Sequence, residues 1–169
     1  MRDLQRGMQT KGIWLAVLML VGLAMPAGAS AVSPNNGLRA YLDGRPLKLS
    51  DVADWYCDDF SYPVIECYSD AGDLEVRTAA LLSFSSFDYV TIYDYGTFTG
   101  PYMQVSQDYT ILATIGWNDR ISSFKARNSR EGHFQTDWFY GGTGYYFCCN
   151  QQVAYLGSFD NTFSSVRQG

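Results

Sequence analysis

The chain has 169 residues, of which 47% are hydrophobic and 17% are charged, and its formal net charge is −5. This length predicts one domain and leaves little room for two large ones. The 17 acidic residues outnumber the 12 Lys and Arg, which excludes the clustered basic face that nucleic-acid binding requires.

The first 29 residues are predicted to be a signal peptide. A basic start precedes an apolar stretch over 13–27, and Ala27-Gly28-Ala29 offers small residues to signal peptidase. A membrane anchor is the alternative, but the stretch is interrupted by Pro26, and a spanning helix needs roughly 20 residues. Removal of residues 1–29 leaves 9 basic against 16 acidic residues, a net charge of −7. We therefore expect a secreted, extracellular protein without a stable membrane anchor.

Residues 30–86 are predicted to form an extension with short helices. Ser50 can cap a first helix over 50–57, and a second helix is expected over 70–82, where apolar residues follow the capping residues Ser69 and Asp70. The segment between the helices is expected to be extended, with no strand partner indicated by the sequence.

Four cysteines remain after cleavage: Cys57, Cys67, Cys148 and Cys149. An even number in an exported protein indicates disulfides, and three pairings are possible. Adjacent cysteines in a strand point to opposite faces, so we favour bridges from Cys57 and Cys67 to the Cys148-Cys149 pair. Zinc is disfavoured because no Cys-x-x-Cys spacing is present.

Beyond residue 87, aromatic and β-branched residues alternate with polar ones in short runs that are separated by turn residues. Runs at 89–93, 102–105 and 145–148 are typical of antiparallel strands. The sequence therefore predicts an all-β sandwich of roughly 80 residues.

This half of the chain also contains an internal repeat. An aromatic, a second aromatic five residues later and a Gly two residues after that occur at Tyr93, Phe98 and Gly100, and again at Phe134, Phe139 and Gly141. A turn-forming stretch at 118–123 is repeated 42 residues later at 160–165. Glycine in such a hairpin can adopt a positive φ that a side chain would penalise.

These residues resemble the βγ-crystallin family, whose Greek-key motifs carry an aromatic-x4-aromatic-x-Gly hairpin and an Asn/Asp-Asn/Asp-x-x-Ser/Thr-Ser stretch. The resemblance covers about residues 87–168. It implies a two-motif sandwich over 87–169, with motif one at 87–127 and motif two at 128–169. Each motif is expected to lend a strand to the sheet of the other.

The resemblance to the calcium-binding, microbial members also implies two Ca2+ sites. In motif one the expected ligands are Asn118, Asp119, the carbonyl of Arg120 and the hydroxyl of Ser122. In motif two they are Asp160, Asn161, the carbonyl of Thr162 and the hydroxyl of Ser164. A hairpin carbonyl near Asp94 or Gln135 is expected to reach the cation bound by the other motif, whereas Ser123 and Ser165 are expected to satisfy backbone groups.

Each stretch supplies one carboxylate, so modest affinity is expected, with dissociation constants on the order of 10 μM to 1 mM. The cation of Arg120 is expected to weaken the first site further. The alternative is that both stretches are plain turns, because Asp, Asn and Ser side chains also cap local backbone groups.

Catalysis is not predicted. His133 is the sole histidine, it has no nucleophile motif nearby, and it is interpreted as a surface turn residue. Asp58 and Asp59 are interpreted as a solvated acidic pair on a short helix.

The sequence therefore favours a secreted calcium-binding protein with a structural or stress-related role. The alternative is a secreted proteinase inhibitor with a crystallin-like fold, which would present a rigid exposed loop. Residues 30–86 could bind an unknown protein partner.

Overall fold

The computed structural model describes residues 37–82 and 88–169, and the predicted signal peptide lies outside them. In this part of the chain no helix has the length and apolarity to cross a membrane. Val32–Gly169 is one compact unit. Its strands form an eight-stranded and a three-stranded sheet within the described residues.

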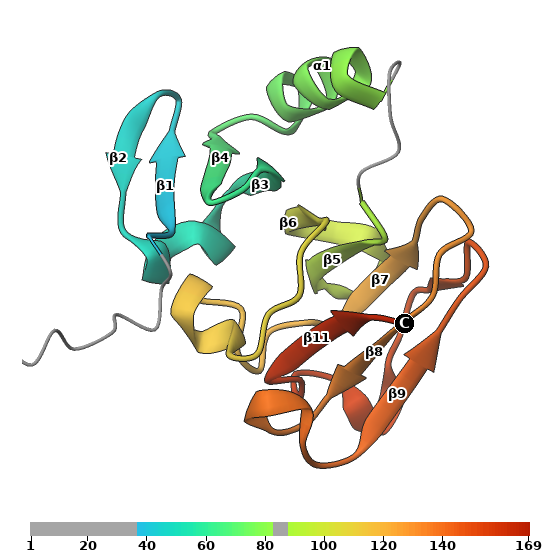
Figure 1. Cartoon of the computed structure of the whole chain (residues 1–169). Coiled ribbons are helices and arrows are strands. Elements are labelled where there is room, and N and C mark those ends of the chain that lie inside the picture. Colours follow the sequence, from blue (N-terminus) through green and yellow to red (C-terminus); the bar gives the residue numbers. More distant parts are fainter. Residues whose placement is uncertain (1–36, 83–87) are drawn as a thin grey trace, which may run out of the picture. The chain divides into compact units, whose positions relative to one another are not determined.

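Both motifs of the C-terminal half begin with an antiparallel hairpin. Their strands are β5 (Val90–Tyr95), β6 (Thr99–Val105) and β7 (Ser123–Ala126) in motif one, and β8 (Gly132–Gln135), β9 (Gly144–Phe147), β10 (Gln152–Val153) and β11 (Ser165–Gln168) in motif two. In each motif the last strand, β7 or β11, pairs with the first, β5 or β8. Strands β11, β8 and β9 lie side by side as the three-stranded sheet (Figure 1).

The two motifs exchange their third strands. Strand β10 of motif two pairs with β7 of motif one. In return, Tyr109 of motif one forms an isolated antiparallel bridge with Val166 of β11, with N···O distances of 2.8 and 2.9 Å. The strand exchange that the resemblance implies is thereby confirmed, as is the predicted all-β fold with two Greek-key motifs.

The extension continues the sheet of motif one. Its strands are β1 (Arg39–Leu42), β2 (Arg45–Leu47), β3 (Tyr56–Ser61) and β4 (Val64–Tyr68). Strand β3 pairs in parallel with β6, giving the sheet order β10-β7-β5-β6-β3-β4-β1-β2. The predicted extended segment therefore has its partner in β6.

The second predicted helix, 70–82, is present as α1 over Ala71–Leu82. The first, predicted over 50–57 with Ser50 as its cap, is a shorter 3-10 helix over Leu49–Asp54. Ser50 lies inside it and does not cap it, since Lys48 precedes the helix and β3 begins at Tyr56. Four further 3-10 turns lie in the C-terminal half of the described chain, at Gly96–Phe98, Leu112–Ile115, Trp138–Tyr140 and Gly157–Phe159. The helix α1 begins where Asp70 Oδ1 accepts a hydrogen bond from the Gly72 amide at 2.7 Å, which is a turn contact of the predicted capping residue.

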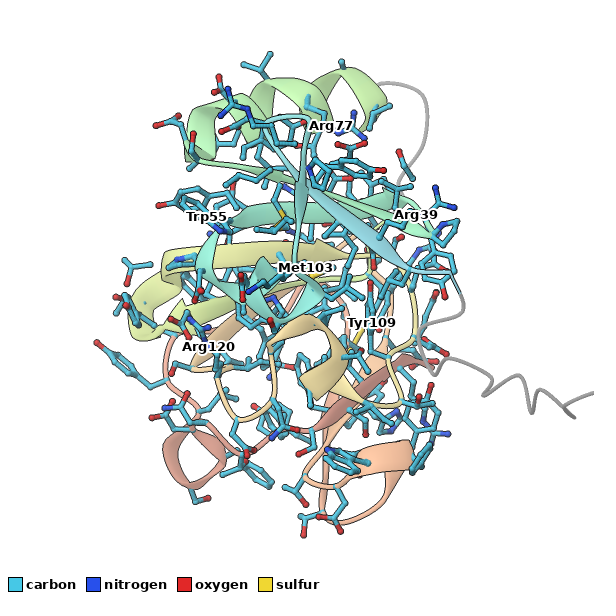
Figure 2. All side chains as sticks on the ribbon, turned by 90° about the vertical axis from the view of Figure 1, so that its left-hand side faces the viewer. Arg39, Trp55, Arg77, Met103, Tyr109 and Arg120 are labelled. Carbon is cyan, nitrogen blue, oxygen red and sulfur yellow. A yellow bond between two sulfur atoms is a disulfide. The ribbon has the colours of Figure 1, made fainter. Side chains whose placement is uncertain are left out.

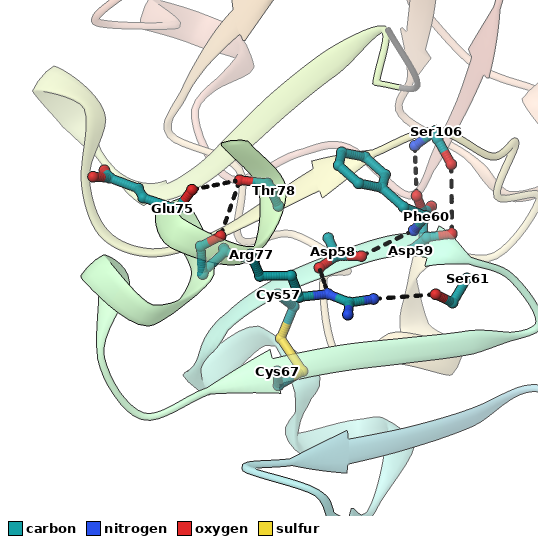
Figure 3. Close-up of polar contacts among 11 residues, drawn as sticks. Cys57, Asp58, Asp59, Phe60, Ser61, Cys67, Glu75, Arg77, Thr78 and Ser106 are labelled. Atoms are coloured by element: carbon teal, nitrogen blue, oxygen red, sulfur yellow. Dashed lines mark hydrogen bonds and ion pairs between the residues drawn. A yellow bond between two sulfur atoms is a disulfide. The ribbon is translucent and has the colours of Figure 1, made fainter. Parts of the chain in front are cut away.

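The cysteine pairing differs from the favoured one. Cys57 on β3 and Cys67 on β4 are directly opposite each other and form a disulfide (Figure 3). Cys148 and Cys149 are bonded to each other. The prediction was wrong because it placed both adjacent cysteines in a strand, whereas β9 ends at Phe147 and Cys149 has a φ of 60° in a turn.

The main core lies between the inner faces of the two sheets. Alternate residues of the β5–β7 region point inward, and Ile92, Met103 and Phe124 are fully buried there against Phe134 and Phe163 of motif two. The intervening residues face the opposite side of the eight-stranded sheet, since side chains alternate along a strand. On that outer side, Tyr93 and Tyr102 form a second, smaller cluster with Leu74 of α1.

Candidate calcium sites

The two predicted calcium stretches occupy equivalent, reciprocal turns. Asp119 and Asn161 both adopt a left-handed conformation, with φ of 54° and 55°. The amide of Asp119 donates to the carbonyl of Phe163 at 3.0 Å, and the amide of Asn161 donates to the carbonyl of Ile121 at 3.1 Å. Each turn is thus fastened to the stretch of the other motif, which brings the two candidate loops together.

The last serine of each stretch holds the hairpin of its own motif. Ser123 Oγ donates to the carbonyl of Tyr95 at 2.6 Å and accepts from the amide of Phe98 at 3.0 Å. Ser165 Oγ makes the same pair of bonds with the carbonyl of Asp137 at 2.7 Å and the amide of Tyr140 at 3.1 Å. The expectation that these serines satisfy backbone groups is confirmed.

These bonds also correct the alignment of the second hairpin. They equate Phe98 with Tyr140, a shift of 42 positions, whereas the predicted repeat equated Phe98 with Phe139. The residue equivalent to Gly100 is then Gly142, and both have positive φ, 77° and 74°, whereas Gly141 has a φ of −89°. Gln135 takes the place of the first aromatic, Tyr93. The preceding Phe134 misled the alignment, because it points into the core instead.

A first cavity of about 360 Å³ lies where the two motifs meet. Its lining includes Gly96 and Ser122 of motif one together with Asp160 of motif two. Ser122 Oγ donates to the side-chain oxygen of Asn161 at 3.1 Å. The cavity is therefore lined by a hydroxyl of motif one and a carboxylate of motif two, and the amide of Asn161 is hydrogen-bonded to that hydroxyl.

A second cavity of about 380 Å³ is lined by Thr136, Asp137, Trp138 and Ser164 of motif two. Asn118 of motif one contacts this lining, since its side-chain oxygen accepts a hydrogen bond from Trp138 Nε1 at 3.1 Å. Asn118 Nδ2 in turn donates to Asp119 Oδ2 at 2.7 Å.

The predicted ligands are therefore brought together crosswise. Ser122 bonds to Asn161 and lines the first cavity with Asp160. Asn118 bonds to Trp138, which lines the second cavity with Ser164. Thr162 directs its hydroxyl to the carbonyl of Phe159 at 2.8 Å, which leaves its own carbonyl as the predicted ligand.

The donor set fits a hard cation of modest affinity. Ca2+ takes about 6 to 8 oxygens, including hydroxyl, carbonyl and water oxygens. The described residues contain no cluster of three or more His, Cys, Asp or Glu side chains that could hold a metal, so most protein ligands would be neutral oxygens. Asp160 is the carboxylate at the first cavity, and Asp137 lines the second.

Arg120 does not leave an unpaired cation beside the first cavity. Its Nε and Nη2 atoms each bond to a different oxygen of Asp94 at 2.9 Å, and Nη1 bonds to Asp54 of the extension at 2.8 Å. The Arg120 side chain is labelled in Figure 2. These hydrogen bonds raise the pKa of Arg120. Two carboxylates thus compensate the charge of Arg120, and the expected weakening of the first site stays a prediction.

Three other residues considered in the sequence lie elsewhere than expected. His133 is half-buried on β8 rather than in a surface turn, and its ring lies 5.1 Å from that of Tyr146. Asp58 and Asp59 lie on β3 and are fully buried rather than solvated on a helix (Figure 3).

The two buried acids have different partners. Asp58 accepts from Arg77 Nε at 3.0 Å, and burial raises its pKa despite that cation. Asp59 accepts from the Ser106 amide at 2.7 Å and from the Tyr109 hydroxyl at 3.0 Å, and burial raises its pKa to about 7. Neither acid lines the candidate calcium cavities, and Asp59 instead fastens the extension to the segment that follows β6.

Solved structures that match this chain include several βγ-crystallin domains. A βγ-crystallin from an archaeon is 28% identical over 47% of this chain and 95% of its own, with a TM-score of 0.41. A βγ-crystallin domain from Flavobacterium johnsoniae is 25% identical over 48% and 94%, with a TM-score of 0.43. The N-terminal domain of Protein S is 24% identical over 47% and 93%, also with a TM-score of 0.43.

The C-terminal half has the fold that its resemblance to βγ-crystallin domains implies. This statement rests on the exchanged third strands and the serine-fastened hairpins of the chain itself. No family model matches the chain. No curated protein matches it either.

Proposed function

We propose that the chain is an exported, non-enzymatic calcium-binding protein with a structural or stress-related role, in which Ca2+ stabilises the βγ-crystallin-like domain. The observation that carries the proposal is the crosswise arrangement of oxygen donors, in which Ser122 lies with Asp160 and Asn161. An ion held by both motifs would oppose their separation.

The ligands proposed for the first site are Ser122, Asp160, Asn161 and a main-chain carbonyl of the Gly96 hairpin. Those proposed for the second are Ser164, Asn118, Asp119 and Asp137, again with a hairpin carbonyl. The carbonyls of Arg120 and Thr162 complete the two sets. When bound, the ion supplies positive charge between oxygen atoms that otherwise repel one another.

Urea unfolding with and without calcium tests this function. A ligand that binds only the folded state raises the free energy of unfolding by RT ln(1 + [L]/Kd), which is about 1.4 kcal/mol for one site at ten times its Kd. The rise should disappear with a chelator and in the Asp119→Ala, Asp160→Ala double variant. Equal unfolding curves with calcium and with chelator, at calcium concentrations up to about 10 mM, would exclude the proposal.

A further inference from the structure

The outer side of the eight-stranded sheet, opposite the main core, carries a third cavity of about 370 Å³. We call it the outer cavity. Its aromatic lining is formed by Tyr93 of β5, Tyr102 of β6 and Phe98 of the hairpin. Helix α1 covers this aromatic cluster with Leu74, which is fully buried. The extension thus turns a sheet face that would meet solvent in a bare sandwich into a walled cavity.

The polar lining of the outer cavity contains two cations. Lys125 of β7 and Arg127 just after it face the cavity. Arg127 Nε donates to Thr91 Oγ1 at 3.0 Å and lies 3.8 Å from Asp88 Oδ2, so one positive charge has a partner. Glu75 of α1 stands at the exposed edge of the same cavity.

Lys125 has no carboxylate at ion-pair distance among the described residues. Its ammonium group lies 4.6 Å from the ring centre of Phe98 and 5.5 Å from that of Tyr93. Burial and the neighbouring charge of Arg127 lower the pKa of Lys125, and the carboxylate of Glu75 opposes this shift only in part. An anion placed in the cavity would raise the pKa of Lys125 again, because it would compensate the ammonium charge.

The amide of Gln104 is a second, independent sign of a missing ligand. Gln104 on β6 lines the cavity and is only 7% exposed. Its side-chain oxygen is buried and has no hydrogen-bond partner among the described residues. An unsatisfied buried acceptor costs about 1 to 3 kcal/mol, and a ligand hydroxyl reached by rotation of this amide would remove that cost.

We propose that the outer cavity binds a small hydroxylated monocarboxylate, of the size and chemistry of a hexuronic acid. The carboxylate would pair with Lys125 and Arg127, a hydroxyl would donate to Gln104, and the C–H face of the sugar ring would pack on the tyrosines. Glu75 at the edge disfavours a second negative charge, which selects against phosphate. A volume of 370 Å³ lies within the range of ligand pockets, about 300 to 1,000 Å³.

Titration of the purified protein with glucuronate, glucose and inorganic phosphate tests this inference. The titrations are followed by calorimetry and by the ring resonances of Tyr93 and Tyr102. A chelator is present throughout, so that no calcium is bound. The outer cavity shares no lining residue with the two candidate calcium cavities. The outcome is therefore independent of the calcium proposal.

The expected result is saturable glucuronate binding that Lys125→Met weakens about tenfold or more, since a hydrogen bond to a charged group is lost. Lys48→Met is the matched control, because Lys48 is exposed and does not line the outer cavity. It should leave binding unchanged. Glucose should bind at least about tenfold more weakly than glucuronate. Unchanged unfolding of Lys125→Met would show that the loss is not a folding defect.

Three results would overturn the inference. The first is glucuronate binding that does not saturate up to about 10 mM. The second is equal binding by Lys125→Met and the unsubstituted protein. The third is phosphate or glucose binding as tightly as glucuronate, which would remove the requirement for a hydroxylated monocarboxylate.

Discussion

At the residue scale, the second hairpin depends on Gly142 where the first depends on Gly100. Both glycines have a positive φ, and Asn118 follows Gly100 by the same eighteen positions that separate Asp160 from Gly142. A Cβ atom on Gly142 would lie 2.3 Å from Thr136 Oγ1, whereas one on Gly141 would meet nothing closer than 3.3 Å. The two neighbouring glycines are therefore not equivalent.

Gly142→Ala should destabilise the protein by about 1 to 3 kcal/mol, because the left-handed conformation alone costs an L-residue about 1 to 2 kcal/mol. Gly141→Ala is the matched control and should cost less than about 1 kcal/mol. Urea unfolding of both variants measures the difference. If Gly141→Ala lowered the free energy of unfolding more than Gly142→Ala, the result would support the alignment that the sequence repeat predicts.

At the element scale, strand β3 joins the extension to motif one through more than backbone pairing. Asp59 accepts hydrogen bonds from the amides of Ser106 and Gln107 and from the Tyr109 hydroxyl. Tyr109 is also the residue that bridges to β11. A buried carboxyl group of the extension thus supports the strand that motif one lends to motif two.

The raised pKa of Asp59 makes this support dependent on pH. The folded protein keeps the Asp59 proton up to about pH 7, whereas the unfolded chain releases it near 3.8. Between these values the folded state binds more protons, so the free energy of unfolding should fall as pH rises from about 4 to 7. In the Asp59→Asn variant, the free energy of unfolding measured with urea should fall less steeply over this pH range, because the Asp59 contribution is absent.

Asp73→Asn, at an exposed position of α1, is the control and should keep the slope of the unsubstituted protein. Asp58 and Asp88 also have raised pKa values, so the informative quantity is the difference between the protein and each variant. If the free energy of unfolding of Asp59→Asn had the same pH dependence as that of the unsubstituted protein, the raised pKa of Asp59 would be contradicted.

Elements that depend on local signals were predictable from the sequence. The helix at Ala71–Leu82 follows its capping residues, and the sandwich follows from alternating strands and the repeat. The parallel pairing of β3 with β6 was not predictable, because it joins segments distant in sequence. The buried state of Asp58 and Asp59 followed from that pairing and was missed with it. Within the candidate site, the repeat indicated the two turns, but neither the crosswise grouping of their side chains nor the place of Asp137, which depend on the strand exchange.

At the scale of the whole molecule, the eight-stranded sheet includes strands of the extension and of both motifs. Arg120 adds a polar link, since it binds Asp94 of motif one and Asp54 of the extension. The extension is thus part of the same compact unit as the sandwich. The first candidate cavity is lined by both motifs, and the lining of the second contacts motif one through the hydrogen bond between Trp138 and Asn118. Cation binding and assembly of the motifs should therefore be coupled.

Calcium titration of two double variants by calorimetry tests the crosswise sites most directly. If Ser122 and Asp160 share one site, Ser122→Ala with Asp160→Ala should leave one of the two binding events intact. Ser122→Ala with Asn118→Ala should abolish both, because these residues would then belong to different sites. The reverse pattern, with one event kept in the Ser122, Asn118 variant and none in the Ser122, Asp160 variant, would contradict sites shared between the motifs.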